Sequence, residues 1–341
     1  MAKRRSNRVQ EDVLSQMVIG KWISQAIASV VEIGVPDQLA KGAKRCSEIA
    51  RKAGVSEDGV YRLLRALASV GLFSEGADRR FKLTPMGQRL RTDHPQSLAG
   101  YARFTGHDST WRPWGQLTYS VKTGLPAFDQ VFGSPVFEYF SKNPEASAIF
   151  DDAMTGLSAS EALAVADAYE FKKVDTLMDV AGGHGLLLAT VLRRHKTMRG
   201  VLFDLPHVAA GAAATFARAG ITGRVRVESG DFFKELPSGA DAIMMKHIIH
   251  DWDDESATRI LQACHRALGP RGKVLIVDAV VPVGNAPHFG KLLDLEMLVL
   301  TQRGRERTKS EFSALLRGAG FRLSRVVATK GPLSIVETVK A

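Results

Sequence analysis

Acidic and imidazole side chains of this sequence stand where apolar runs end. Asp179, Asp204 and Asp278 each close such a run, and His250 follows another one closely. A carboxylate accepts hydrogen bonds from hydroxyl and amino groups, and an imidazole titrates near neutral pH. These residue types therefore predict a site that binds a polar ligand and moves a proton.

The turn after Asp179 is rich in glycine. The sequence reads Val-Ala-Gly-Gly-His-Gly185, and an apolar stretch from Leu186 to Leu192 then predicts a helix. A strand, a glycine turn and a helix N-terminus open a nucleotide-type α/β domain. The glycines allow the backbone to approach a ligand closely, and the first helical amides point at an anionic group. A dinucleotide fingerprint does not fit, because its third glycine would fall on Leu188.

Seven apolar or alternating runs in the second half predict strands. They are 174–178, 200–203, 225–228, 241–246, 273–278, 321–329 and 333–339. A glycine turn and a helix follow the first run, and another helix begins near Ser256 after the fourth, which indicates a doubly wound α/β sheet. Because ligands bind at the carboxyl ends of such strands, we expect His250 on the ligand side of the sheet. We also expect Asp278, at the end of the neighbouring strand, to reach its ring.

Two further acids suit the parts of a nucleoside. Asp204, at the end of the second strand, is placed to accept hydrogen bonds from both hydroxyls of a ribose. Asp231 follows the third strand and precedes Phe232. A carboxylate accepts from the exocyclic amine of adenine, and an aromatic ring stacks on the base. We therefore predict that this edge of the sheet binds adenosine.

The first hundred residues predict a winged-helix domain. An apolar helix covers Val13 to Val31, Pro36 opens the next helix, Ser47 and Ser56 are the expected N-caps of two more, and a hairpin spans 72–84. Two functions fit this pattern, namely dimerisation and DNA binding. We favour dimerisation, because the long apolar helix would be costly to expose on a monomer.

The chain is predicted to divide into two domains. Residues 1–105 form a winged-helix-like dimerisation domain with an N-terminal helix, and residues 106–341 form the ligand-binding α/β domain. Aromatic side chains are frequent between 106 and 170, along a predicted helical connector. Most of these rings belong in the core, and we expect a few to line the pocket of a second ligand.

Composition is ordinary for a globular protein. Of 341 residues, 45% are hydrophobic and 24% are charged, and no apolar run reaches the roughly 18 residues of a membrane span. Cys46 and Cys264 stand far apart and suggest neither a disulfide nor a metal site, so we expect a cytoplasmic protein. The net charge of +10 fits nucleic acid, acidic lipid or simply a basic surface. The basic residues are spread along the chain and are dense only over 3–8, which favours a basic surface.

Several motifs occur in an order that resembles one enzyme family. They are Asp179 to Gly185, Phe203-Asp-Leu-Pro206, Gly230-Asp-Phe-Phe233, Lys246, His250-Asp-Trp252, Gly272-Lys-Val274 with Asp278, and Gly304-Arg-Glu-Arg-Thr308. The set is similar to that of plant-type O-methyltransferases of small phenolic molecules (caffeate, flavonoid and hydroxyindole enzymes) and their bacterial relatives in natural-product pathways. The resemblance implies a seven-stranded class I methyltransferase domain, S-adenosylmethionine as cofactor, S-adenosylhomocysteine as product and no metal. It also implies a homodimer that acts on a small aromatic substrate. Ala181 departs from the usual glycine.

The resemblance further implies roles for residues of the site. In phenol methylation the hydroxyl loses its proton as oxygen attacks the methyl carbon in line with sulfur. His250 is the expected general base, with Asp278 and Glu306 as orienting acids. Asp278 stands where the family usually has glutamate, so the shorter acid would hold the ring from further away or through water. The expected cofactor ligands are Asp179, Gly182, Gly183, Asp204, Leu205, Asp231, Phe232, Lys246 and Ser158. The expected substrate contacts are Phe150, Met154, Trp252, Asp251, Met297 and Thr301.

Several alternatives stay open at this point. His247 competes with His250 as the base, although we expect its side chain to face the core or a helix. A His-x-x-His-Asp metal site lacks a third ligand at a convincing spacing. The same scaffold suits methylation of nitrogen or of a non-aromatic hydroxyl. The alternative to an enzyme is a cofactor-sensing regulator that binds DNA through the winged helix.

Overall fold

The computed structural model describes residues 13–341, so the basic cluster at 3–8 lies outside the described residues. The chain forms two compact units. The first comprises Met1–Arg112 and Phe140–Leu157, and the second comprises Pro113–Tyr139 and Ser158–Ala341. The long helix α11 (Pro144–Ala168) therefore belongs partly to each. The domain boundary between residues 105 and 106 stays a prediction.

A small helical domain with a β-hairpin makes up most of the first unit. Its helices are α2 (Gly20–Glu32), α3 (Val35–Gln38), α4 (Cys46–Ala53), α5 (Glu57–Ser69) and α6 (Ala99–Gly106). Its strands pair in the order β1 (Lys44–Arg45), β3 (Arg80–Leu83) and β2 (Phe73–Gly76). The 3-10 helices η1 (Ala77–Arg79) and η2 (Gly87–Leu90) follow β2 and β3. Apolar side chains of these helices and strands share one core.

The predicted winged-helix elements are present, with differences at the start of one helix and within the first helix. Ser56 caps α5 through its side chain, as expected. Ser47 does not cap α4, which begins one residue earlier at Cys46. The residue before this helix is Arg45, and its backbone N–H donates to the Glu48 carboxylate. The cap position therefore holds no serine hydroxyl. The predicted first helix is interrupted at Ile19, between helical residues 13–18 and α2.

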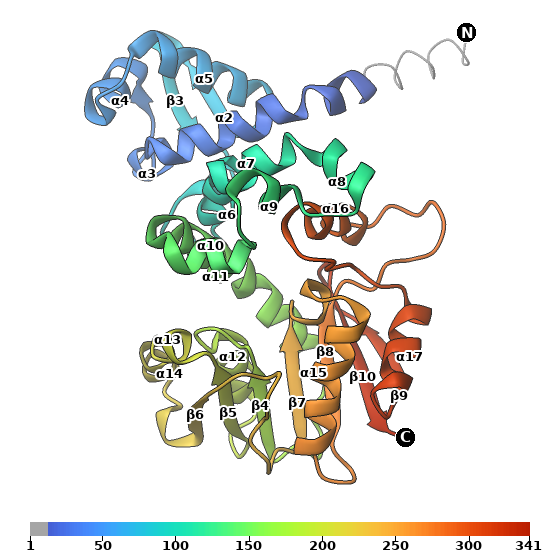
Figure 1. The fold of residues 1–341 in the computed structure, drawn as a ribbon. Helices are drawn as coiled ribbons and strands as arrows, with labels where there is room; N and C mark the ends of the chain where they lie inside the picture. The colour runs from blue at the N-terminus through green and yellow to red at the C-terminus, as the bar shows by residue number, and fades with distance from the viewer. Residues whose placement is uncertain (1–12) are drawn as a thin grey trace, which may run out of the picture. The chain divides into compact units, whose positions relative to one another are not determined.

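A seven-stranded sheet forms the centre of the second unit (Figure 1). Its order is β6 (Val225–Ser229), β5 (Arg199–Asp204), β4 (Thr176–Val180), β7 (Ala242–Lys246), β8 (Lys273–Asp278), β10 (Ser334–Lys340) and β9 (Phe321–Ala328). The first five strands are parallel, and β10 pairs antiparallel with β8 and β9. The strand order reverses between β4 and β7, where a doubly wound sheet binds its ligand. The predicted fold is confirmed.

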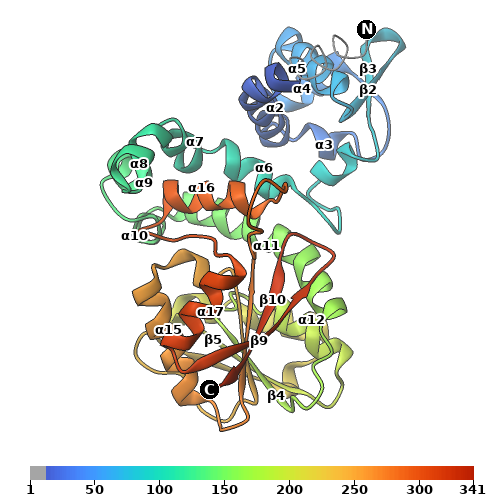
Figure 2. The same ribbon diagram turned by 90° about the vertical axis from the view of Figure 1, so that its right-hand side faces the viewer.

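Helices cover both faces of this sheet (Figure 2). On one face, α12 (Leu186–Arg194), α14 (Ala212–Ala219) and the end of α11 share a core with the strands. On the other face, α15 (Asp254–Ala267) and α17 (Lys309–Gly318) do so. The connections contain the short helices α13 (Pro206–Ala209), η3 (Thr222–Arg224) and η4 (Ile249–Asp251). The central strands read as apolar runs because both of their faces are buried.

A helical layer of the second unit lies beyond the carboxyl ends of the central strands (Figures 1 and 2). In it, α8 (Leu117–Thr123) and α9 (Ala127–Phe132) pack against α16 (Gly290–Leu300). Helices α7 (Asp108–Trp114) and α10 (Val136–Lys142) cross from one unit to the other. Helix α16 thus lies beyond the carboxyl ends of the strands, and the predicted site residues are at these ends.

Among residues 13–341, every helix is too short or too polar to span a lipid bilayer. Cys46 and Cys264 are both buried and unpaired.

Candidate active site

The glycine turn joins β4 to α12 in a conformation that larger residues would disturb. Gly183 and Gly185 have positive φ values of 60° and 75°. A Cβ on Gly182 would lie 2.6 Å from the carboxyl carbon of Asp179, so the turn passes close to that acid. Ala181 has a φ of 53°, which glycine adopts without strain and alanine does not. Alanine at position 181, where the family usually has glycine, therefore adopts the same turn with a small backbone strain.

Asp204 ties this turn to the end of β5. Its Oδ2 accepts the Gly183 N–H at 2.8 Å, and its Oδ1 accepts the Leu205 N–H at 2.7 Å. Burial raises the pKa of Asp204, against the opposing effect of these two N–H groups. Burial also raises the pKa of Asp179 to about 7, and its Oδ2 has no partner among the described residues. The structure thus brings together five of the expected cofactor ligands, namely Asp179, Gly182, Gly183, Asp204 and Leu205.

Asp231 and Phe232 lie in a loop after β6 that aromatic rings hold in place. Asp231 Oδ1 accepts the Phe233 N–H at 2.9 Å. Phe233 meets Trp252 edge to face with 4.8 Å between ring centroids, and Phe232 meets the same indole at 6.1 Å. The loop after β6 and the segment after η4 therefore meet through these rings, although β6 is at the edge of the sheet.

Lys246 and His247 follow one another at the end of β7, and both bind Glu161 on α11. Lys246 Nζ lies 2.9 Å from Glu161 Oε2, and His247 Nε2 lies 3.1 Å from Glu161 Oε1. Burial acts to raise the pKa of Glu161, but His247 and Lys246 outweigh it and lower the pKa to about 2. Burial and the Lys246 charge lower the pKa of His247 to about 4. His247 is therefore a neutral imidazole that donates its Nε2–H toward α11.

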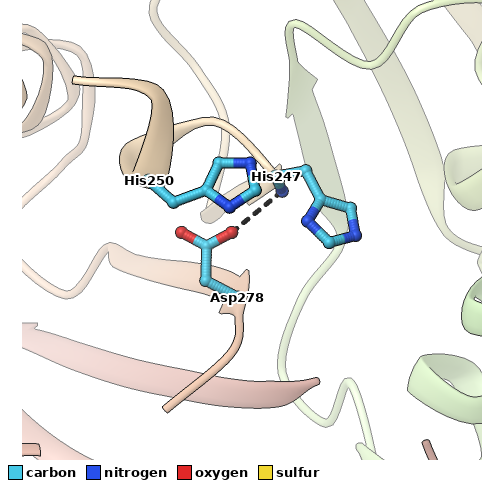
Figure 3. Close-up of side chains that lie close together, drawn as sticks. All are labelled: His247, His250 and Asp278. Atoms are coloured by element: carbon cyan, nitrogen blue, oxygen red, sulfur yellow. Dashed lines mark hydrogen bonds between the residues drawn. The ribbon is translucent and has the colours of Figure 1, made fainter. Parts of the chain in front are cut away.

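His250 lies among three carboxylates just beyond β7. Its Nδ1 is 2.6 Å from Glu306 Oε1, and its Nε2 is 3.6 Å from Asp251 Oδ1. Asp278 lies beside the ring, but its Oδ1 accepts the backbone N–H of His247 at 3.0 Å (Figure 3). Glu306, and not Asp278, is hydrogen-bonded to the His250 ring. An orienting role for Asp278 stays a prediction.

The carboxylates around His250 decide its proton affinity. Burial lowers the pKa of His250, but the charge of Asp251, the Glu306 hydrogen bond and the charge of Asp278 raise it to about 10. Burial raises the pKa of Asp278 to about 7 and that of Asp251 to about 6. The side chains of His250 and Glu306 are 7% and 0% exposed. Once it has lost its Nε2 proton, a buried imidazole held by a carboxylate in this way is a proton acceptor with a fixed tautomer.

Sequence reasoning assigned no role to Arg307, which binds the backbone on both sides of His250. Arg307 is 1% exposed. Its guanidinium donates to the carbonyl oxygens of Ile249 at 2.9 Å and Trp252 at 2.8 Å, and to the Asp254 carboxylate at 2.7 Å. Its place in the motif at 304–308 was the only available signal, because a single buried guanidinium leaves no periodic pattern.

The chain after α16 passes closely against the same loop. A Cβ on Gly304 would lie 2.7 Å from the His250 carbonyl oxygen, and the Arg305 N–H donates to that oxygen at 2.7 Å. Asp294 on α16 accepts the Glu306 N–H at 2.8 Å. Helix α16 therefore helps to place the acid that holds His250.

The expected substrate contacts fall in different parts of the fold. Met297 and Thr301 are buried at the end of α16, where the Thr301 hydroxyl donates to the Met297 carbonyl oxygen at 2.7 Å. Phe150 and Met154 lie on the part of α11 that belongs to the first unit, whereas Ser158 begins the part in the second unit. Contacts of these three α11 residues with a ligand stay predictions.

His247, His250 and Asp278 supply possible metal ligands within 4.8 Å of one another (Figure 3). Asp278 is the third ligand that the sequence spacing did not reveal. Ligand atoms of a tetrahedral zinc lie closer, at about 3.4 Å from each other. One nitrogen of each imidazole is already engaged by Glu161 or Glu306. The geometry therefore suits hydrogen bonding better than metal coordination, and the lack of a metal stays a prediction.

Comparison with known proteins covers both halves of the chain. Residues 114–322 match the model of the O-methyltransferase domain, and residues 15–93 match the O-methyltransferase dimerisation domain. The chain is 40% identical over 325 residues to the phenazine O-methyltransferase PhzM of Lysobacter antibioticus, with 95% of each chain covered. It is 39% identical over 335 residues to the O-demethylpuromycin-O-methyltransferase of Streptomyces alboniger, covering 96% of this chain and 88% of the relative.

A solved structure extends the likeness to the cofactor. The human N-acetylserotonin methyltransferase, determined in complex with S-adenosylmethionine, superposes with a TM-score of 0.90 at 25% identity. The match covers 97% of this chain and 98% of the human chain. Together with the family models, these relatives show that the chain belongs to the O-methyltransferase family and is an S-adenosylmethionine-dependent methyltransferase.

Proposed function

We propose that this enzyme methylates a hydroxyl of a small aromatic natural product, with His250 as the general base. The observation that supports this most is the 2.6 Å contact between His250 Nδ1 and Glu306 Oε1 in a buried site beyond β7. A base whose far nitrogen is held by an acid has a fixed orientation toward its substrate. Among the relatives, the phenazine enzyme and the 3-amino-4-hydroxybenzoate 4-O-methyltransferase of Streptomyces cremeus, 35% identical over 314 residues, bear names that fit such acceptors.

The residues beside the glycine turn fit the cofactor. The Asp204 carboxylate and the positive-φ turn at Gly183 form a cradle for ribose and for the methionine part. Asp231 and Phe232 would contact adenine, and Lys246 would contact the adenosine edge. The partnerless Oδ2 of buried Asp179 leaves an acceptor for an ammonium group. When bound, S-adenosylmethionine supplies the methyl group that is transferred.

At the acceptor, the protein contributes a proton acceptor and its placement. His250 Nε2 takes the hydroxyl proton as the acceptor oxygen attacks, and Glu306 stabilises the imidazolium that results. Asp251, Trp252, Met297 and Thr301 border the acceptor in this proposal. General-base catalysis contributes about 10²–10⁴-fold, and the alignment of the two reactants supplies the remainder.

The test is a screen for methyl transfer. Purified enzyme is incubated with labelled cofactor and a panel of phenols, quinones and flavonoid-like rings, and products are read by mass spectrometry. We expect the enzyme to add one methyl group to an oxygen atom of at least one of these three classes of compound. Cofactor binding without methylation of any small molecule would contradict the proposal. Tight retention of duplex DNA in about 150 mM salt would then favour the regulator.

Nitrogen is a second candidate acceptor. The 8-amino-8-demethylriboflavin N,N-dimethyltransferase of Streptomyces davaonensis is 35% identical to this chain over 312 residues. Aminophenols in the same screen separate the two outcomes, because fragmentation of the product shows whether nitrogen or oxygen carries the methyl group.

We further propose that the enzyme is a homodimer through its first unit. The match to a dimerisation domain at 15–93 supports this. So does an exposed apolar surface at the start of the chain, with Leu14, Met17, Val18 and Trp22 between 63% and 71% exposed. Light scattering on the full chain tests the proposal, and a monomer at micromolar concentration would contradict it. The cytoplasmic location stays a prediction.

Replacing Glu306 by glutamine is expected to move the pH profile of the reaction toward lower pH. His250 acts as a base only after it has lost its proton, and its pKa of about 10 puts that loss on the alkaline side. kcat/KM should therefore rise with pH through neutrality. Glu306→Gln removes one of the groups that raise this pKa, so the rise should shift by about 1 pH unit.

The profile is measured as kcat/KM against pH, with an NMR titration of the histidine rings alongside. Glu255→Gln, at an exposed acid of α15, is the control and should leave the profile in place. An unshifted profile in Glu306→Gln would mean that another group sets the alkaline rise.

Replacing Asp204 by asparagine is expected to weaken cofactor binding by about 10–100-fold, since the amide loses the charge and one acceptor. Asp241→Asn is the matched control, because Asp241 Oδ2 also accepts two backbone N–H groups, at 2.9 and 2.8 Å, but at the amino end of the sheet. Calorimetric titration measures both dissociation constants. Equal losses in the two variants would show that the effect is structural.

A further inference from the structure

A carboxyl group on α16 in the second unit has no basic partner among the described residues. Glu296 is one residue before Met297, and the Trp114 indole N–H donates to its Oε2. Burial raises the pKa of this carboxyl to about 7, and the Trp114 hydrogen bond acts in the other direction. No Lys, Arg or His of the described chain contributes to that pKa. Glu296 therefore differs from Glu161 and Glu306, which both bind basic groups.

Within residues 13–341 Glu296 Oε1 has no hydrogen-bond partner, and the side chain is only half-buried. A purely structural link between α16 and Trp114 needs one neutral acceptor, which glutamine would supply. An ionisable carboxyl in this position costs desolvation energy that a link alone does not explain. Glu296 Oε1 is suited to a donor that arrives with a ligand.

Glu296 shares helix α16 with a residue that holds the partner of the catalytic group. Two residues earlier on the helix, Asp294 accepts the N–H of Glu306, which in turn contacts His250. The helix also carries Met297 and ends before Thr301, which are two of the residues expected to contact the substrate. Glu296 thus belongs to the same short element that positions the base and borders the acceptor.

We propose that Glu296 is a specificity-determining residue that binds an amino group on the aromatic acceptor. This rests on the proposed function, because the acceptor is the molecule whose hydroxyl faces His250. The preferred substrates are then hydroxylated aromatic molecules with a protonated amine or an N–H-rich substituent at a distance from the reacting oxygen. The carboxylate accepts hydrogen bonds from that group, and Trp114 holds the carboxylate in place.

The experiment compares pairs of phenols that differ only in an amino substituent, such as tyramine with 4-ethylphenol and the aminophenols with phenol. Binding is measured by calorimetry on the full-length enzyme loaded with S-adenosylhomocysteine, so the readout does not depend on turnover. We expect the wild-type enzyme to prefer the amino member of at least one pair by about tenfold. Glu296→Gln keeps an acceptor for Trp114 and removes the charge, so this preference should fall to within about twofold.

Trp114→Phe is the matched control, because it removes the indole donor and leaves the carboxylate. It should retain most of the preference. A wild-type enzyme without preference in any pair would overturn the inference. An equal loss of affinity for both members of a pair in Glu296→Gln would also overturn it and leave Glu296 as a structural link. Failure of methyl transfer to every phenol would instead overturn the proposed function, because the binding comparison is independent of that outcome.

Discussion

Replacing His250 by alanine is expected to lower kcat by about 10²–10⁴-fold and to leave the dissociation constant of S-adenosylmethionine within a few-fold. The imidazole is the expected proton acceptor, and Glu306 at 2.6 Å fixes its orientation. The expected cofactor ligands at Asp204 and Gly183 belong to β5 and the turn after β4, so they do not depend on this ring. Single-turnover kinetics and calorimetry measure the two quantities separately.

His247 provides the control for this prediction. It is the same residue type, and its ring centroid lies 5.0 Å from that of His250. Because its Nε2–H donates to Glu161 and its pKa is lowered to about 4, it is a poor base at neutral pH. Glutamine can replace this Nε2 donor, so His247→Gln should cost less than about tenfold in kcat. If His247→Gln were the more damaging change, His247 would be the base and the assignment would be wrong.

Glu306 and His250 should also act as a unit. If the acid works only by holding the imidazole, Glu306→Ala in a His250→Ala background should add little to the loss in kcat. Additive losses would show that Glu306 contacts the substrate or another group directly.

Local patterns were sufficient to predict the sheet and its ligand-binding edge. A strand buried on both faces must be apolar along its whole length, so the run before Asp179 and the run before Asp204 were recognisable. Parallel neighbours align their carboxyl ends, which brings Asp204 within 2.8 Å of the Gly183 amide. These residues come together because of the topology of adjacent strands, and short stretches of sequence report that topology.

Partners from distant parts of the chain were not predictable. Glu161 lies 85 residues before Lys246, on a helix whose buried face carries no signal for an acid. The choice between Asp278 and Glu306 depends on the backbone at His247, whose φ of 56° turns its N–H toward Asp278. Asp278 already accepts that bond, and the His250 ring is hydrogen-bonded to Glu306. Such a conformation at a non-glycine residue has no reliable mark in a sequence.

Arg307 is the residue whose loss is expected to be most damaging outside the reacting groups. Arg307→Met keeps much of the volume and removes the guanidinium, so the carbonyl oxygens of Ile249 and Trp252 lose their donors at 2.9 and 2.8 Å. It also removes a buried positive charge beside acids, because Arg307 acts to lower the pKa of Asp278. We expect the free energy of unfolding to fall by about 3 kcal/mol. We also expect kcat to fall at least about tenfold, since η4 carries His250.

Arg305→Met is the matched control for this change. Arg305 is 44% exposed and pairs with Glu311, which is 39% exposed, so its loss should cost less than about 1 kcal/mol.

Arg307→Lys separates charge from geometry, because an ammonium group cannot make the guanidinium's separate bonds to two carbonyls and a carboxylate. If charge alone mattered, lysine would restore most of the stability and activity. We expect it to restore little of kcat, because the position of His250 depends on the two carbonyl contacts. Chemical denaturation and steady-state kinetics on the three variants decide this, and equal effects at 305 and 307 would refute the assigned role.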